Sequence, residues 1–380
     1  MSAKHIRTVC EYAFYMLKTS LVPQNKINRK NESKNDNSSA NGTSKNNKLY
    51  SRKIRSKNAK YSAKITSENA SKIISCLAII AFMGFMLAKP EYYLNSARRG
   101  LSLFATSVLP SLFPFYFCSL LLTYMGAVGA ISKVGAKSVK LMYNAPKESA
   151  YVLFLSMLCG YPVGASTIYE LYSAGVISQK DAKCSCSFCS TSGPIFMIGT
   201  IGGAIFQNQK VGLIVLAAHY LGAIVNGFLY RKRKSPDEAS AFSVQKDVDG
   251  ILSRAISKAT VNMLYVGGYI VLCGMIIDTL ELLGIRNLLE NFGAAGEPIL
   301  SVIYSLVEMT RASIECSKCG NLQLATALCA GAVSFGGLSI TMQNYTFLSK
   351  CGVGFFELML KKFTQCCFAV LFAFLLGFAL

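Results

Sequence analysis

The chain has 380 residues, of which 15% are charged and 52% belong to the apolar set AVILMFWYC. This composition excludes an ordinary soluble domain and indicates a membrane protein with several spans. The net charge of +20 is uneven, because residues 1–72 contain 16 Lys and Arg against 4 Asp and Glu and so contribute +12 of it.

Residues 1–72 form a basic segment rich in Asn, Ser and Lys. Residues 24–70 have almost no apolar periodicity, and such a segment cannot bury enough surface to offset the ordering of its backbone. We therefore predict a disordered tail, which the positive-inside rule places in the cytoplasm. No nucleic-acid-binding signature accompanies the basic residues, so we expect a lipid membrane and no nucleic acid as a partner.

The first long apolar run, residues 73–88, begins far from the N-terminus and lacks a small-residue cleavage site. We therefore expect it to remain as a membrane anchor. The next run, residues 101–131, contains Pro110 and Pro114. Because an interior proline removes a backbone hydrogen bond and ends or kinks a helix, residues 109–114 predict the turn of a re-entrant hairpin.

Three later segments of the first half have simpler patterns. Residues 133–147 are basic and amphipathic, which predicts a short helix at the membrane surface. Residues 211–230 are apolar and long enough to cross the hydrocarbon core. The Arg-Lys-Arg-Lys run that follows predicts a cytoplasmic loop over residues 231–256.

Gly, Pro and small hydroxyl residues interrupt two apolar stretches in each half of the chain. Residues 160–166 read Gly-Tyr-Pro-Val-Gly-Ala-Ser, and residues 190–194 read Ser-Thr-Ser-Gly-Pro. The second half has Glu-Met-Thr-Arg-Ala-Ser at 308–313 and Ser-Phe-Gly-Gly-Leu-Ser at 334–339. The first interruption of each half aligns with an offset of 147 residues, taken from Ser166 to Ser313. The second interruption of each half aligns with an offset of 144 residues, taken from Gly193 to Gly337. Paired interruptions of this kind point to the substrate site of a transporter.

These patterns predict an all-α polytopic membrane protein with about eight spans, built from two structural repeats with interrupted helices and re-entrant hairpins. The predicted parts are the tail at 1–72, the anchor and first repeat at 73–230, the basic loop at 231–256 and the second repeat at 257–380. Whether the repeats run parallel or inverted stays open, as does the oligomeric state.

The interruptions also predict which residues bind the substrate. An unwound backbone at membrane depth exposes N–H and C=O groups, helix N-termini suit anions, and Gly permits close approach. A single interruption of this kind could instead serve close packing of helices, which Gly and Ser also permit. Two interruptions in matching positions of the two halves favour a substrate site. The candidate substrate-binding residues are Gly160, Tyr161, Pro162, Gly164, Ser166, Ser190, Thr191, Ser192, Gly193, Pro194, Glu308, Thr310, Arg311, Ser334, Gly336, Gly337, Ser339 and Gln343.

Glu308, Arg311 and Glu315 are three and four residues apart, a spacing that places them on one helical face. An ionisable residue inside a membrane is costly to bury and therefore points to function. Arg311 could present its planar guanidinium to a substrate carboxylate. The two glutamates could equally neutralise it in a structural ladder, and both alternatives stay open.

No phosphate-binding loop, nucleophile elbow or zinc-protease signature occurs, so we expect no enzymatic activity and no cofactor. The cysteines at 184–189 and 316–319 could hold zinc, but Cys also packs as a small hydrophobe. We favour packing and predict no metal site. His219 has no Cys or carboxylate at metal-ligand spacing and is expected to be a packed residue.

Residues 109–115, 160–165, 187–196 and 334–339 together resemble the sporulation integral membrane proteins of the YlbJ type, within the wider nucleoside-recognition or Gate-domain family. The resemblance covers residues 73–380. It implies a polytopic transporter related to concentrative nucleoside carriers, which moves dipicolinic acid through the outer forespore membrane. The interruptions of both halves would then line the path of the solute.

The sequence and the resemblance together predict a transporter of a small carboxylated or heteroaromatic solute, with dipicolinate in spore formation as the leading candidate. A nucleoside or nucleobase transporter and a non-transporting assembly protein of the spore envelope are the alternatives. Expected partners are a small-molecule anion and a lipid membrane, with H⁺ or Na⁺ as candidates for a coupling ion. We expect the chain in the cell membrane or the outer forespore membrane.

Overall fold

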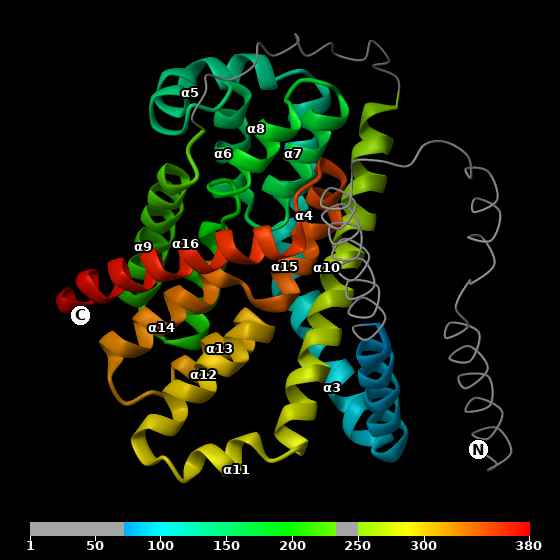
Figure 1. Ribbon diagram of the computed structural model, residues 1–380, viewed down its shortest axis with the longest axis vertical. Coiled ribbons are helices and arrows are strands. Elements are labelled where there is room, and N and C mark those ends of the chain that lie inside the picture. The colour runs from blue at the N-terminus through cyan, green and yellow to red at the C-terminus, as the bar shows by residue number, and fades with distance from the viewer. Residues whose placement is uncertain (1–71, 233–249) are drawn as a thin grey trace, which may run out of the picture. The chain divides into compact units, whose positions relative to one another are not determined.

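The computed structural model describes residues 72–232 and 250–380, and all regular elements of these residues are helices (Figure 1). Contacts divide the chain into two units, residues 1–78 and 79–380, and the account below concerns the second unit. Most of the predicted tail and of the predicted basic loop lie outside the described residues. The labelled helices are α3 (Pro90–Leu103), α4 (Leu109–Tyr124), α5 (Val128–Tyr143), α6 (Glu148–Cys159), α7 (Val163–Ser173), α8 (Gln179–Ser185), α9 (Gln209–Leu229), α10 (Ile251–Leu282), α11 (Ile285–Glu290), α12 (Gly296–Val307), α13 (Met309–Cys316), α14 (Leu322–Phe335), α15 (Gly337–Leu348) and α16 (Phe355–Leu376).

Five helical runs of the described residues are long and apolar enough to cross a membrane. They are Pro90–Tyr124, Gln209–Leu229, Ile251–Leu282, Leu322–Cys351 and Phe355–Leu376. Shorter apolar helices occur at Lys72–Ala88, Glu148–Cys159, Ile195–Ile205 and Gly293–Val307. The predicted all-α polytopic membrane fold is therefore confirmed, and interrupted helices are part of it.

The predicted turn at residues 109–114 is wrong. α3 continues through a π-helical turn, η1 (Phe104–Val108), directly into α4. Pro110 and Pro114 thus lie inside one continuous helix. The π turn just before Pro110 shifts the hydrogen-bond register, and Leu109 N–H donates to the carbonyl of Phe104. The Ser111 hydroxyl also donates to backbone carbonyls one turn earlier, at 2.8 and 3.0 Å. The helix thus accommodates both prolines without ending.

The expected surface helix at 133–147 and the expected span at 211–230 correspond to α5 and α9. α5 ends at Asn144, which adopts the left-handed conformation with φ of 56° that often terminates helices. α10 begins at Ile251, within the loop predicted at 231–256.

α16 packs against α9 and α14 through small residues (Figure 1). A Cβ atom added to Gly222 of α9 would lie 3.1 Å from the backbone nitrogen of Ala369 in α16. A Cβ atom on Gly331 of α14 would lie 2.6 Å from a methyl carbon of Val370. Small residues at such contacts let membrane helices approach closely. This three-helix group supports the second interruption of each half.

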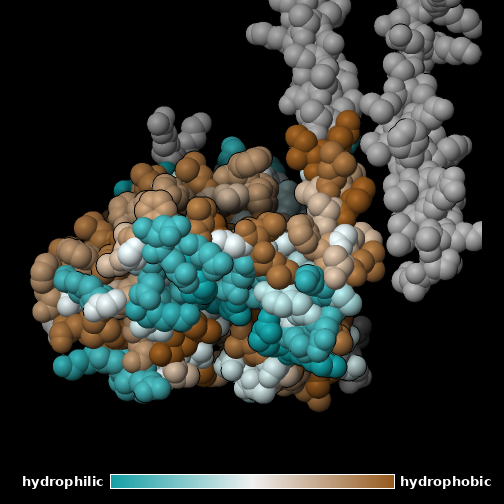
Figure 2. Space-filling view, turned by 90° about the horizontal axis from the view of Figure 1, so that it is seen from below, coloured by the Kyte–Doolittle hydropathy of each residue, from teal (hydrophilic) through white to brown (hydrophobic). Residues whose placement is uncertain are grey.

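α10 packs against α3 and α4 on one side and contacts α15 on another. Its outward face carries exposed apolar side chains such as Leu264 and Leu272, as a lipid-facing surface would. Hydrophilic residues gather instead on the end of the unit seen in Figure 2, among hydrophobic neighbours. Glu290, the last residue of α11, and Glu297, in the first turn of α12, are exposed.

Candidate functional site

The two interruptions of the first half lie against each other. α6 ends at Cys159, Gly160 takes a φ of +81°, and α7 starts at Val163, while residues 190–193 are non-helical before the π-helix η2 (Ile195–Ile205). A Cβ atom on Gly160 would lie 2.6 Å from the nitrogen of Gly193. Glycine is therefore required where the two unwound segments meet.

The two interruptions of the second half also meet. Glu308 is extended, with φ of −152° and ψ of 127°, and separates α12 from α13. Gly336 has a φ of +74° and separates α14 from α15. A Cβ atom on Gly337 would lie 2.7 Å from the carbonyl carbon of Val307, so these segments are in backbone contact as well.

Hydrogen bonds join the first pair of interruptions to the second. The Tyr161 hydroxyl donates to the carbonyl of Val333 at 3.2 Å. Nε2 of His219 accepts from the backbone N–H of Ser192 at 2.9 Å, while Nδ1 lies 2.7 Å from the hydroxyl of Ser334. The amide of Asn344 in α15 donates to the Ser190 hydroxyl at 3.0 Å. All four interrupted segments therefore form one polar centre.

A buried cavity of about 40 Å³ lies within this centre. Val108, Leu112, Phe196 and Ile270 belong to its apolar wall. This volume is well below the ~150 Å³ of an engineered cavity that binds benzene. The structure therefore shows the centre closed, with no room for a solute that contains an aromatic ring.

Seven of the eighteen predicted residues line the cavity, and they come from both halves of the chain. These are Tyr161, Ser192, Gly193, Glu308, Thr310, Ser339 and Gln343. The others do not line it and include the glycines of the close contacts and residues bonded elsewhere: Gly160, Pro162, Gly164, Ser166, Ser190, Thr191, Pro194, Arg311, Ser334, Gly336 and Gly337. Ser166, for example, bonds the Tyr116 hydroxyl of α4 at 2.6 Å.

Glu308 is 2% exposed and caps α13. Its carboxylate accepts from the backbone N–H of Thr310 at 2.9 Å and from that of Arg311 at 2.8 Å. The prediction that Glu308 shares a helical face with Arg311 and Glu315 is wrong, because the extended backbone at 308 turns the carboxylate back onto the start of the helix. The N-terminus of α13 is thus already occupied by an anion.

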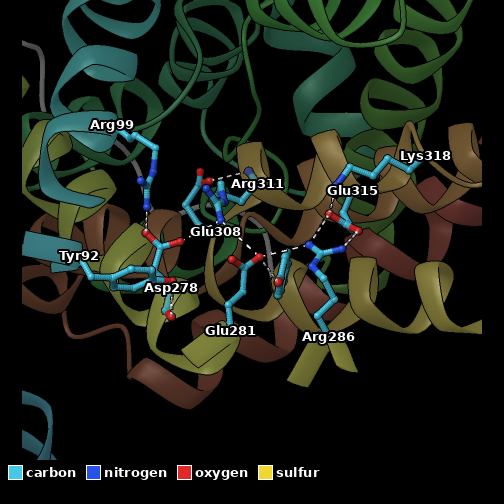
Figure 3. A network of polar contacts seen from close by, with 10 residues as sticks. Tyr92, Arg99, Asp278, Glu281, Arg286, Glu308, Arg311, Glu315 and Lys318 are labelled. Atoms are coloured by element: carbon cyan, nitrogen blue, oxygen red, sulfur yellow. Dashed lines mark hydrogen bonds and ion pairs between the residues drawn. The ribbon is translucent and has the colours of Figure 1, made fainter. Parts of the chain in front are cut away.

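Arg311 points away from the cavity into a charged network with α10 (Figure 3). Its guanidinium donates to Asp278 at 2.9 Å and lies 3.6 Å from Glu281. Asp278 also accepts from Arg99 at 2.7 Å. The ladder with Glu308 and Glu315 is therefore not formed, and residues of α10 neutralise Arg311 instead.

Glu315 belongs to the other end of the same network. It accepts from Arg286 of α11 at 2.9 Å and from Lys318 at 2.8 Å (Figure 3). The ion pair with Arg286 joins α11 to α13. Glu315 therefore holds helices together and does not line the cavity.

Sequence reasoning missed three residues of the polar centre. His219 was expected to be a packed residue, but it bridges the interruptions of both halves. Asn344 was not considered. Lys362 was not considered either, and α16, which begins at Phe355, carries it into the centre. A lysine followed by a long apolar run was the available signal for this position.

Lys362 is 1% exposed. Its Nζ atom lies 2.7 Å from the Tyr161 hydroxyl, 3.1 Å from the carbonyl of Ser190 and 3.3 Å from Oε1 of Gln365. The ammonium also lies 4.5 Å from the centre of the Tyr161 ring. Within the described part of the chain, no carboxylate lies within ion-pair distance of it.

The cysteines considered for zinc are buried or nearly so. Cys184 donates to the carbonyl of Tyr143 at 3.7 Å, and Cys186 lies 3.4 Å from the Nζ atom of Lys361. In the residues that the structure describes, no group of three or more His, Cys, Asp or Glu side chains is arranged to hold a metal ion.

Comparison with known proteins shows similarity to the sporulation integral membrane protein YlbJ of Bacillus subtilis (strain 168). The two chains are 25% identical over 338 residues, which cover 80% of this chain and 83% of that protein. No protein-family model matches the chain, and no solved structure matches it. The similarity confirms the resemblance to YlbJ-type integral membrane proteins that the four motifs predicted.

Proposed function

We propose that this protein transports a small carboxylated or heteroaromatic solute across a membrane, and that dipicolinate is that solute. One observation carries the proposal: four interrupted segments from two halves of the chain meet around a single cavity. Non-helical backbone at membrane depth is tolerated where it is buried in protein or lines a cavity, and transporters bind their substrates at such places.

The nature of the solute rests on the similarity to a sporulation membrane protein and on the polar groups of the centre. Hydroxyls, an amide and an ammonium suit a planar anion better than they suit an apolar compound. Transport at the outer forespore membrane, with the N-terminus in the cytoplasm, is part of the same proposal.

The direct test is uptake of radiolabelled dipicolinate into proteoliposomes that contain the purified full-length protein. We expect saturable uptake above that of empty liposomes, with uridine as a poor competitor. Repeating the assay with and without a proton gradient tests the coupling ion. Absence of both dipicolinate and uridine uptake, from protein shown to be inserted, would refute the proposal.

A substitution in the cavity wall provides a matched test. Gly193→Leu places a large side chain where a Cβ atom already lies 3.3 Å from the carbonyl oxygen of Cys159, so we expect uptake to be lost. Gly199→Leu is the control, because Gly199 lies in the nearby π-helix η2 and a Cβ atom on it would meet nothing within 4 Å. Equal uptake by the two variants would show that the solute does not pass through this centre.

A further inference from the structure

We infer that the anionic group of the solute binds at Lys362, in a site completed by Tyr161 and the backbone of Ser190. This inference rests on the proposed transport function and adds the position of the counter-charge, which neither the sequence patterns nor the YlbJ similarity assigns.

The two lysines of α16 that lie side by side in sequence differ in their partners. Lys361, 5% exposed, is paired with Glu357 at 2.7 Å. Lys362, 1% exposed, has acceptors for its three N–H groups, but all of these acceptors are neutral. An ammonium removed from water without a counter-ion is strongly unfavourable, and an incoming carboxylate would supply the missing charge.

The other cationic features near the cavity are already neutralised. Arg311 is paired with Asp278, and the N-terminus of α13 holds the carboxylate of Glu308. Among the described residues around the centre, Lys362 is therefore the buried cation that has a free charge to offer a solute.

The ammonium is reached from the cavity by way of Tyr161. The Tyr161 side chain lines the cavity, and its hydroxyl touches Nζ of Lys362. Because the cavity, at about 40 Å³, is much smaller than one that binds an aromatic ring, a solute has to displace the Tyr161 ring or widen the contact between the interrupted segments. Either movement exposes the ammonium at the wall of the enlarged site.

The wall of the cavity also contains a neutral polar group. Gln343 is buried and lines the cavity, and its Oε1 atom has no hydrogen-bond partner. A polar group left unsatisfied in a buried site is unfavourable and is expected to bond a ligand or a water. The unpaired atom is an acceptor, so beside a bound carboxylate it would accept from a water or from a donor group of the solute.

The test compares a charged solute with a neutral one on the same protein. Uptake of radiolabelled dipicolinate into proteoliposomes is measured with unlabelled dipicolinate or its neutral analogue, pyridine-2,6-dicarboxamide, as competitor. The wild type is expected to prefer the acid. Lys362→Met is expected to reduce this preference by at least about tenfold, because a charge-assisted bond is lost. Lys362→Arg should retain most of it.

Lys350→Met is the matched control. Lys350 is exposed and lies over the ring of Tyr169, so this substitution removes the same charge at a position outside the centre. Because the preference is a ratio between two competitors, it does not depend on the fraction of each variant that folds. An unchanged preference in Lys362→Met, with normal wild-type uptake, would overturn the Lys362 assignment and leave transport standing. A wild type that takes up uridine but not dipicolinate would overturn both the assignment and the solute class.

Discussion

Substitution of Gly337 by alanine tests whether close backbone contact builds the centre. Gly337 has a φ of +65°, and an added Cβ atom would lie 2.7 Å from both the carbonyl carbon and the oxygen of Val307. The left-handed conformation costs a residue with a Cβ atom about 1–2 kcal/mol. Overpacking against backbone that cannot rotate away adds about 1–3 kcal/mol. We therefore expect Gly337→Ala to destabilise the protein by about 2–5 kcal/mol.

Gly284→Ala is the matched control for the conformational part of this effect. Gly284 has a φ of +82°, and its Cβ atom would meet nothing within 4 Å, so only the first contribution applies. Thermal unfolding in detergent can be followed with a thiol-reactive dye, because nine of the described cysteines are buried and become reactive on unfolding. A midpoint for Gly337→Ala equal to that of Gly284→Ala would refute the close contact between Gly337 and Val307.

The charged groups around α13 give two further predictions. Glu308→Ala should lower the thermal midpoint, because loss of a helix N-cap costs about 0.5–2 kcal/mol. The control, Glu297→Ala, changes an exposed residue and should alter the midpoint little. Equal midpoints for the two variants would contradict the capping role of Glu308. A double-mutant cycle of Arg311→Ala and Asp278→Asn should give a coupling energy of about 1 kcal/mol, because the arginine is partly exposed. Strict additivity of the two changes would show that this ion pair contributes nothing.

The interruptions could be predicted because their causes are local. Gly160 and Gly336 adopt positive φ angles that glycine alone tolerates well, and Pro162 lies beside the first of them. Such residues within an apolar run mark a break whatever packs around it. Both positions are breaks in the structure.

Features that depend on distant parts of the chain could not be predicted in this way. Pro110 and Pro114 resemble a turn locally, but the helix continues through both, with a π-helical turn just before Pro110. Arg311 has glutamates at helical spacing on both sides, yet its partner is Asp278, 33 residues earlier. Lys362 bonds Tyr161, 201 residues away, and no spacing rule connects the two.

The hydrogen bonds that join the two halves set a conformational equilibrium for the protein. The four bonds made by Tyr161, His219 and Asn344 each contribute about 0.5–1.5 kcal/mol, so a state in which they are broken lies several kcal/mol higher and is rarely populated without solute. The apparent affinity for the solute equals the intrinsic affinity of the open state multiplied by the fraction of molecules that are open. Weakening the bonds of His219 or Asn344, which are not part of the anion site at Lys362, should therefore tighten apparent solute binding, while the barrier to passive leakage falls.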